Sequence, residues 1–345
     1  MPVLTRPADL PGVVSRARDG DVLALSRLLS VLEDTPEPSD FLDLVPALPE
    51  ATVTIGLTGP PGAGKSTLTA ALVECRRARS RRVAVLAVDP SSAATQGAVL
   101  GDRIRMTRLS EDDGVFVRSL AARGHLGGLA IRLPAAIRAL AWAGFDEIIV
   151  ETVGVGQSET AIADVVDTTV VVLSPGQGDS VQAAKAGILE IADIYAVNKA
   201  DQSGADRVVR DLRSTILFAS GTGPGEWRPP VVRTVASDSD VGRLDEHLSD
   251  HSTWLRDHGR LSERRVAFVR REVRGIVEGR LKQNLDAVLS EAGLRSVVER
   301  VAGHETPLTD ALRLAESSLA VALASAAPAP RAGTGTPGDG GGSKA

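Results

Sequence analysis

The amino-acid sequence predicts an α/β protein whose mostly parallel β-sheet is flanked by helices. Between residues 50 and 258, seven short apolar runs alternate with helix-length segments, and a glycine-rich stretch follows the first run. Such alternation is typical of a parallel sheet that is covered on both faces. The runs that indicate strands are residues 52–58, 82–89, 115–120, 146–151, 168–173, 194–199 and 230–237.

The segments on either side of this region indicate helical appendages. Residues 1–48 are predicted to form short helices interrupted by prolines, one of them over 21–32. The α/β domain is assigned to residues 49–258, and a C-terminal helical region to 259–325. Residues 326–345 are rich in proline, glycine and alanine, so we expect them to be disordered.

Apolar residues recur at three- and four-residue steps in the C-terminal helical region, and arginine and glutamate fill its other faces. Such a stripe must be buried, either against the α/β domain or against a second subunit. Because the α/β unit is complete without it, we favour a subunit contact. This apolar stripe consists of Val266, Val269, Val273, Ile276, Val277, Leu281, Leu285, Val288 and Leu289.

The composition excludes several classes of protein. Hydrophobic residues make up 43% of the chain, which is too many for a disordered protein. The net charge of −5 argues against a nucleic-acid binder with broad phosphate contacts. Cys75 is the single cysteine, so neither an internal disulfide nor a thiolate metal cage can form. Because the sequence has no run of 18 apolar residues and no secretory signal, we expect no membrane span and a cytoplasmic location.

A nucleotide-binding loop is predicted after the first strand. The sequence GPPGAGKST, residues 59–67, matches the pattern G-x-x-x-x-G-K-[ST] between a strand and a helix, which is the context that the pattern requires. The glycines let backbone amides converge on a phosphate, and the helix N-terminus adds a favourable dipole. We expect Lys65 to reach the β- and γ-phosphates and Ser66 to ligate Mg²⁺. The candidate nucleotide-binding residues of this loop are Gly59, Pro60, Pro61, Gly62, Ala63, Gly64, Lys65, Ser66 and Thr67.

A second motif, NKAD, indicates which base is bound. Asn198, Lys199 and Asp201 follow a predicted strand at the carboxyl edge of the sheet. A carboxylate there accepts hydrogen bonds from N1–H and the exocyclic amine of guanine, whereas adenine offers neither donor in that arrangement. The stem of Lys199 can cover the face of the base. The sequence therefore favours GTP over ATP.

A third group of candidate residues follows the strand predicted over 146–151. Glu151 stands where a Walker B acid holds Mg²⁺, directly or through water. Gly154 lets a backbone N–H approach the γ-phosphate, so residues 152–160 are predicted to be a nucleotide-sensing switch. Gln157 is a candidate for orienting the attacking water, and a solvated loop glutamine is the alternative interpretation.

Further acidic candidates come from the strand predicted over 82–89 and the segment after it. Asp89 ends this strand and Asp102 lies downstream, and both are candidate Mg²⁺ ligands. For a carboxylate at a strand end, a helix N-cap is the alternative interpretation. Arg103 or Arg105 is a candidate for stabilising developing charge, although most arginines are simply solvated.

Two histidines raise the possibility of a metal site. His247 and His251 share a helix face at a spacing of four residues. A metal site needs further ligands, and none is evident nearby in the sequence. We therefore predict a pair of surface histidines.

Five segments together resemble one family. GPPGAGKST, VDPSSAATQGAVLGDRIRM, FVRSLAARGHLGGLA, ETVGVGQSE and NKAD occur in the order found in the MeaB/ArgK GTPases, and the resemblance covers about residues 20–310. Members of this family are GTPase chaperones of adenosylcobalamin-dependent methylmalonyl-CoA mutase. The resemblance implies a P-loop domain of the SIMIBI type that binds GTP or GDP with Mg²⁺. It also implies that GTP binding and hydrolysis gate cobalamin loading and protect the mutase from inactivation.

The same resemblance assigns roles to further segments. It implies a homodimer joined through the C-terminal helical arm, in agreement with the apolar stripe. Residues 175–185, which include Lys185, correspond to an additional switch segment that faces the mutase. Residues 235–237 correspond to a turn that contacts the base; they are Val235, Ala236 and Ser237. Just after them, residues 238–240 stand where relatives usually carry glycine.

Two other functions remain as alternatives. A metal-delivery GTPase of the nickel type requires a Cys/His cluster, and one cysteine with scattered histidines argues against it. A kinase of the ArgK type requires a substrate cleft beside the γ-phosphate and has no need of NKAD. We therefore predict a GTP-hydrolysing chaperone of methylmalonyl-CoA mutase, or of a close acyl-CoA mutase, with no nucleic-acid or membrane partner.

Overall fold

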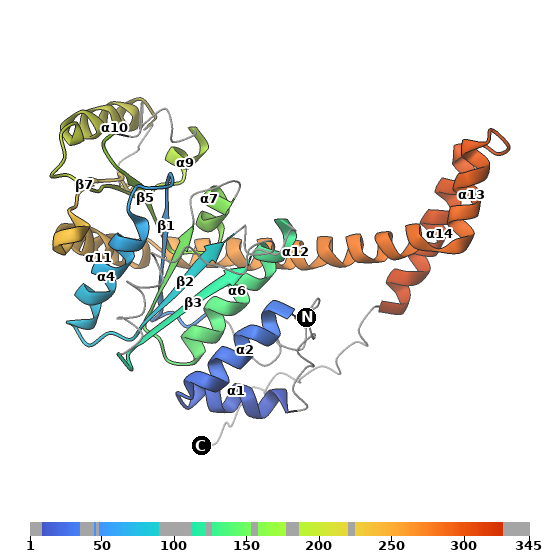
Figure 1. Ribbon diagram of the computed structural model, residues 1–345, viewed down its shortest axis with the longest axis horizontal. Coiled ribbons are helices and arrows are strands. Elements are labelled where there is room, and N and C mark those ends of the chain that lie inside the picture. The colour runs from blue at the N-terminus through green and yellow to red at the C-terminus, as the bar shows by residue number, and fades with distance from the viewer. Residues whose placement is uncertain are drawn as a thin grey trace, which may run out of the picture. The chain divides into compact units, whose positions relative to one another are not determined.

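The computed structural model describes residues 9–34, 45, 48–89, 112–121, 126–152, 158–176, 186–219 and 225–326. The chain divides into two compact units, residues 1–276 and 277–345. The first unit contains the sheet and the helices that cover it, and the second contains the helices α13 (Ala292–Ala302) and α14 (Leu308–Ala326) (Figure 1).

In the part of the chain that the structure describes, seven strands form one sheet in the order β3-β2-β4-β1-β5-β6-β7. Every pairing is parallel, which confirms the predicted α/β fold. Each predicted apolar run overlaps one strand to within a residue or two, except that β7 covers only three residues of the last run, 230–237. The strands are β1 Val53–Thr58, β2 Val83–Asp89, β3 Val115–Ala121, β4 Glu147–Thr152, β5 Thr168–Leu173, β6 Ile194–Val197 and β7 Val231–Arg233.

Helices cover both faces of the sheet because successive side chains of each strand point to opposite faces. On one face, residues such as Ile55 and Leu57 pack in one buried cluster with α4 (Lys65–Arg77) and α11 (Gly242–Asp257). The other face packs against the remaining helices of the first unit. These are α1 Leu10–Arg18, α2 Val22–Asp34, α6 Leu126–Trp142, the short helix α7 Ser158–Ala161, the 3₁₀ helix η1 Ile162–Asp164, α9 Ala186–Glu190 and α10 Ala205–Ala219.

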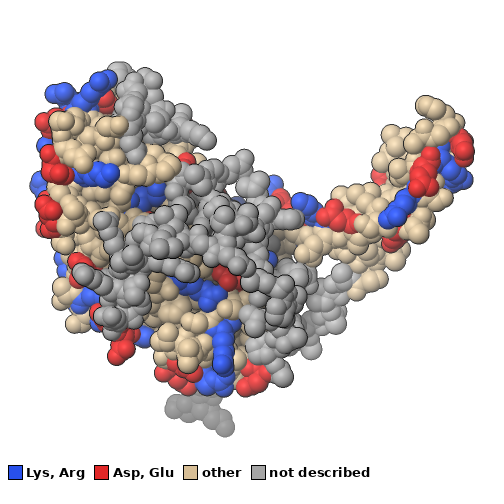
Figure 2. Space-filling view, viewed as in Figure 1, with Lys and Arg blue, Asp and Glu red and all other residues tan. Residues whose placement is uncertain are grey.

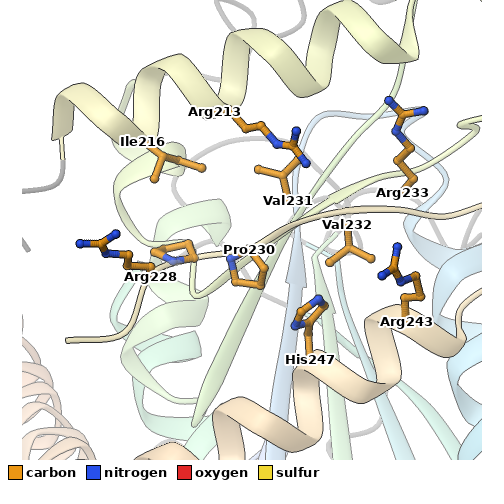
Figure 3. Close-up of a pocket in the computed structure, with 10 residues that line it drawn as sticks. Arg213, Ile216, Arg228, Pro230, Val231, Val232, Arg233, Arg243 and His247 are labelled. Carbon is orange, nitrogen blue, oxygen red and sulfur yellow. The ribbon is translucent and has the colours of Figure 1, made fainter. Parts of the chain in front are cut away.

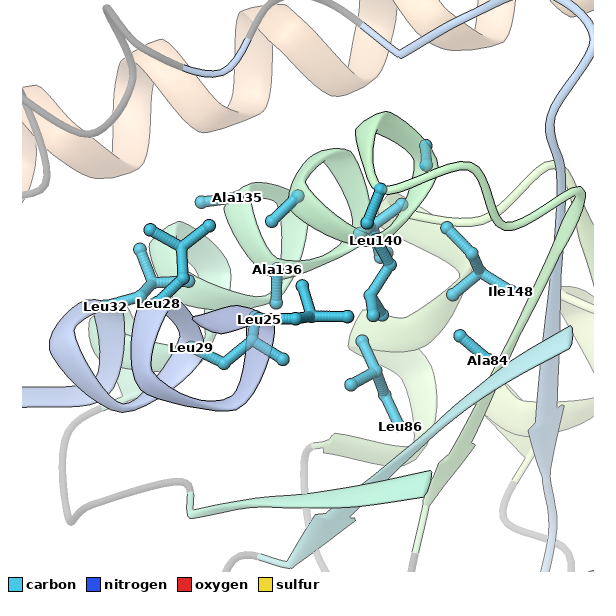
Figure 4. Close-up of a cluster of buried hydrophobic side chains, with 14 of the residues drawn as sticks. Leu25, Leu28, Leu29, Leu32, Ala84, Leu86, Ala135, Ala136, Leu140 and Ile148 are labelled. Atoms are coloured by element: carbon cyan, nitrogen blue, oxygen red, sulfur yellow. The ribbon is translucent and has the colours of Figure 1, made fainter. Parts of the chain in front are cut away.

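The N-terminal helices share their core with the sheet. Leucines of α2 pack in one cluster with Ala135, Ala136 and Leu140 of α6 and with Leu86 and Ile148 of the strands (Figure 4). They recur at three- and four-residue steps, which places them on one face of the helix. Asp21 starts α2 by accepting hydrogen bonds from two backbone N–H groups of its first turn.

Arginines at the start of α12 (Arg260–Ser290) fasten this helix to the sheet. Arg264 forms a bidentate ion pair with Asp193, with N···O distances of 2.8 and 2.5 Å. Arg265 does the same with Asp167, at 3.1 and 2.9 Å. Both carboxylates immediately precede strands and also accept backbone N–H groups of the sheet. Paired guanidinium and carboxylate groups of this geometry are directional, so they fix the start of α12.

The second unit has its own small apolar core. Val288, Leu294 and Ala311 are buried in it, and residues of α13 and α14 pack around them. Among the described residues, none of the helices has the length and apolar character that a membrane crossing requires. On the face shown in Figure 2, basic and acidic side chains of the described residues are interspersed.

His251 shows that the prediction of a surface histidine pair is wrong. His247 is half-buried, but His251 on α11 is fully buried. Its Nδ1 lies 2.9 Å from the hydroxyl of Thr168, and its ring packs against Trp227 with 4.6 Å between centroids. Burial lowers the pKa of His251 to about 4, with Arg264 acting in the same direction and Asp193 opposing it. His251 is thus a neutral core residue.

The depressed pKa of His251 predicts a loss of stability in mild acid. Between pH 6.5 and about 4, the unfolded chain protonates this histidine whereas the folded chain does not. The free energy of unfolding therefore falls as the pH is lowered through this window, by about 3 kcal/mol at most. Urea denaturation across this range should show a shallower pH dependence for His251→Asn than for the unmodified chain. His247→Asn, on the same helix, is the matched control; equal slopes in all three proteins would contradict the assignment.

Candidate functional site

Residues 59–64 form a loop between β1 and α4 that lies against two other strands. Gly59 has a φ of +139°, and a Cβ atom there would lie 2.1 Å from the carbonyl oxygen of Val172 on β5. Gly64 has a φ of +88°, and a Cβ atom there would lie 2.4 Å from Nδ2 of Asn198. A side chain at either position would collide with these groups, so the path of this loop requires glycine.

Lys65, the first residue of α4, is buried with 5% of its surface exposed. Its Nζ donates hydrogen bonds to the carbonyl oxygens of Gly59 at 2.9 Å and Pro60 at 3.1 Å. These bonds hold the ammonium at the loop, beside the N-terminus of α4. The first N–H groups of a helix lack intrahelical acceptors, so ammonium and helix end together create a site that favours anions.

Two hydroxyls of α4 converge on the carboxylate of Glu151. Ser66 donates to Oε1 at 2.5 Å and Thr69 donates to Oε2 at 2.9 Å. Glu151 lies on β4, in register with Leu57 of β1, and is 6% exposed. The structure thus brings together a hydroxyl and a carboxylate that are far apart in the chain. Oxygen donors of this kind suit Mg²⁺, which prefers hard oxygen ligands.

Asn198 joins the loop to the segment after β7. Its Nδ2 donates to the carbonyl oxygen of Ala63 at 3.0 Å, and its Oδ1 accepts from the N–H of Ala236 at 3.2 Å. Asn198 is 1% exposed, so both bonds are shielded from water. The next residue, Lys199, has a φ of +56° and donates from Nζ to the carbonyl oxygen of Gly62 at 2.9 Å. Asp201 lies beside them and is exposed.

The segment after β7 turns without glycine. Residues Ala236–Asp238 form the 3₁₀ helix η2, and Ser239 after it has a φ of +57°. Val235 and Asp240 form an antiparallel bridge that closes this turn. The N–H of Ala236 donates to Oδ1 of Asn198, whereas the N–H of Ser237 has no acceptor among the described residues. The amide of Ser237 is therefore the one available to a ligand.

The structure does not describe all of the predicted site residues. Asp89 is the last residue of β2, one position beyond the pairing of Val88 with Thr152 of β4, so its backbone lies at the carboxyl edge of the sheet. The remaining candidates lie outside the described residues. These are Asp102, Arg103, Arg105, Gly154, Gln157 and Lys185.

A family model described as "Methylmalonyl Co-A mutase-associated GTPase MeaB" matches residues 27–290. The chain belongs to this family. Its fold and the loop at residues 59–67 agree with a MeaB-family GTPase, and the relatives that follow bear names of the same kind.

GTPase ArgK of Escherichia coli K12 is 33% identical over 291 residues, which cover 81% of this chain and 88% of that protein. A protein of Pyrococcus abyssi whose name describes a GTPase is 42% identical over 292 residues, covering 84% of this chain and 90% of that protein. The mouse protein "Methylmalonic aciduria type A homolog, mitochondrial" is 40% identical over 220 residues, covering 62% of this chain and 52% of that protein.

Among solved structures, "LAO/AO transport system kinase" matches with a TM-score of 0.66 at 26% identity, covering 91% of this chain and 98% of that one. The family and the names of the relatives show that this chain is a GTPase, and hence that it binds guanine nucleotides. Within the described ranges, no group of three or more His, Cys, Asp and Glu side chains has a metal-binding arrangement.

Two residues of the candidate site were not predicted from the sequence. Thr69, which holds Glu151, lies three positions after Ser66 on the same face of α4, so helical spacing could have identified it. Thr234 donates to Oδ1 of Asn198 at 3.3 Å, and no local pattern marks it.

Proposed function

We propose that this GTPase assembles with an adenosylcobalamin-dependent methylmalonyl-CoA mutase, or a close acyl-CoA mutase, gates the loading of its cobalamin and protects it from inactivation. The observation that carries the proposal is the family match over residues 27–290, because the family is named for its association with that mutase. The mouse relative, named for methylmalonic aciduria, supports the same client.

For the phosphates we assign residues 59–67. Bound GTP supplies the phosphoanhydride bond, and Mg²⁺ neutralises charge on its phosphates. The glycines keep the backbone of the loop free of Cβ atoms, and Lys65 exchanges the carbonyls of Gly59 and Pro60 for phosphate oxygens. Such a preformed set of donors stabilises charge without reorganising when the reaction occurs.

For the metal we propose Ser66 and Glu151, whose side-chain oxygens lie 2.5 Å apart. Asp89, at the end of β2, and Asp102 are further proposed ligands, and Asp89 and Glu151 would contribute to hydrolysis by holding the bound metal. Gln157 is proposed to orient the attacking water. Thr69 fixes the second carboxylate oxygen of Glu151 and so limits the rotation of this side chain.

For the base we propose Asp201, with Lys199 covering its face and Asn198 holding the surrounding loops. The bond from Lys199 to Gly62 supports this proposal, because it lays the lysine side chain across the phosphate loop. Of residues 235–237, Ser237 supplies the backbone N–H, since that of Ala236 is bonded to Asn198. Val235 immediately precedes η2, and its bridge with Asp240 closes the turn that carries Ser237.

Replacement of Asp201 by Asn should abolish the preference for guanine while the protein stays folded. The amide presents an N–H donor where the carboxylate accepts two hydrogen bonds, so the ratio of GTP to ATP affinity should fall roughly tenfold to hundredfold. Competition of each nucleotide against a fluorescent GDP analogue measures this ratio. The control is Asp257→Asn, at an exposed position of α11. An unchanged ratio in Asp201→Asn would refute the assignment.

We further propose that the chain is a homodimer joined through the apolar stripe of α12. Seven of its nine residues are exposed in the single chain, with Val266, Val269 and Val273 each more than half exposed. Apolar residues at helical spacing that remain exposed over so many turns favour a partner surface of the same kind. The homodimer is also what the family resemblance implies.

A charge in the stripe should separate the subunits. Val273→Asp would place a carboxylate in an apolar contact, so the molar mass measured by light scattering at micromolar concentration should fall from two chains to one. Gln283→Asp, on the opposite side of α12, is the matched control and should leave the mass unchanged. A mass of one chain for the unmodified protein would contradict the dimer directly.

The client is tested by the rate of GTP hydrolysis of the purified protein with and without methylmalonyl-CoA mutase from the same organism. We expect saturating mutase to raise the rate, because the client orders the segments around the γ-phosphate. Asp201→Asn is the internal control and should lose the stimulation with GTP. Basal hydrolysis that does not respond to the mutase would leave the GTPase intact and contradict the client.

A further inference from the structure

We propose that a groove along the free edge of β7 binds an extended acidic segment of a partner protein, which adds to the sheet as an eighth strand. The groove has a volume of about 650 Å³ and lies between α10 and α11, with residues 228–233 as its floor (Figure 3). It is separate from the nucleotide site, which lies at the carboxyl edge of the sheet, so this inference does not depend on the proposed client.

The edge of β7 offers unpaired backbone groups. Among the described residues, β7 is the last strand of the sheet, and it pairs with β6 on one side and with no strand on the other. The carbonyl of Pro230 and the N–H of Thr234 face β6. Because backbone groups alternate in direction along a strand, those of Val231 and Arg233 face outward. No described residue bonds to them, so they can pair with an added strand.

The side chains that line this edge are basic. Arg213 on α10, Arg228 before β7 and Arg243 on α11 are exposed, and none has a carboxylate partner among the described residues. Arg233 pairs with Asp206. The described lining contains no acidic residue, although the chain as a whole has a net charge of −5. This local excess of positive charge complements a segment that carries carboxylates.

The floor of the groove indicates a peptide rather than a small anion. Ile216, Pro230, Val231 and Val232 supply an apolar surface between the arginines. A free phosphate could accept hydrogen bonds from the outward N–H groups of Val231 and Arg233, but it would gain nothing from the apolar floor or from the outward carbonyls. A strand that carries acidic and apolar side chains uses all three features: the guanidinium groups, the apolar floor and the open edge.

The features of β7 also protect an edge strand from aggregation, since it is short and follows two prolines and an arginine. Protection from aggregation requires only that the edge strand is short and has charged residues beside it. It does not require a hollow of this size between two helices, floored with apolar side chains. The groove is therefore the feature that separates a binding edge from a merely protected one.

The test is the binding of a fluorescent peptide, acetyl-Glu-Val-Glu-Val-Glu-Val-Glu-amide, to the full chain saturated with GDP, measured by anisotropy. We expect saturable binding, and no binding of the matched peptide in which Lys replaces Glu. The variant Arg213→Glu/Arg243→Glu should weaken binding at least about tenfold. Its matched control is Arg210→Glu/Arg256→Glu, which makes the same change of charge on the same two helices outside the groove.

A second variant tests the added strand itself. Val231→Pro removes an outward N–H that β6 does not use, so it should weaken the acidic peptide several-fold while GTP hydrolysis stays unchanged. Absence of peptide binding, or equal binding of the Lys peptide, would overturn the proposal. So would competition by tripolyphosphate together with affinity that Val231→Pro does not alter, because that result would define a site for small anions.

Discussion

The nucleotide site depends on the close approach of the loop at residues 59–64 to the ends of β5 and β6. Gly59 brings this loop against the backbone of Val172, and Gly64 brings it against Asn198. The loop can therefore use the buried amide of Asn198 as a support, and Asn198 in turn holds the segment that begins at Ala236. The close approaches at Gly59 and Gly64 thus set the distance between the segments assigned to the phosphates and to the base.

The helix that carries Lys65 and Ser66 is held at both ends. At its start the two hydroxyls of Ser66 and Thr69 bind Glu151. At its end Arg76 pairs with Glu147 at 3.2 Å and with Asp245 at 2.5 Å. Burial raises the pKa of Glu147 despite the opposing effect of Arg76. Glu147 and Glu151 lie on the same strand, so β4 contacts α4 near both ends of the helix.

The two candidate binding sites lie at different edges of the sheet. Parallel strands direct their carboxyl ends to one side, and the nucleotide residues gather there. The lateral edge at β7 is independent of that chemistry and carries the groove with its arginines. At the amino ends of β5 and β6, Asp167 and Asp193 bind the arginines that start α12. The start of α12 is therefore fixed to the sheet by paired charges whose geometry is directional.

The sequence by itself determined the α/β fold, the loop at residues 59–67 and the NKAD motif, because each depends on neighbours in the chain. Spacing also placed Glu151 at a strand end, where parallel topology brings it to the loop. Only the tertiary structure showed that Ser66 and Thr69 hold it, and that Asn198 leaves the N–H of Ser237 available. It also showed that His251 is buried, because its contacts Thr168 and Trp227 come from distant segments. A helical pattern alone cannot distinguish this histidine from a surface residue. The contacts of Asn198 and His251 arise from packing between segments, and local sequence carries no signal for them.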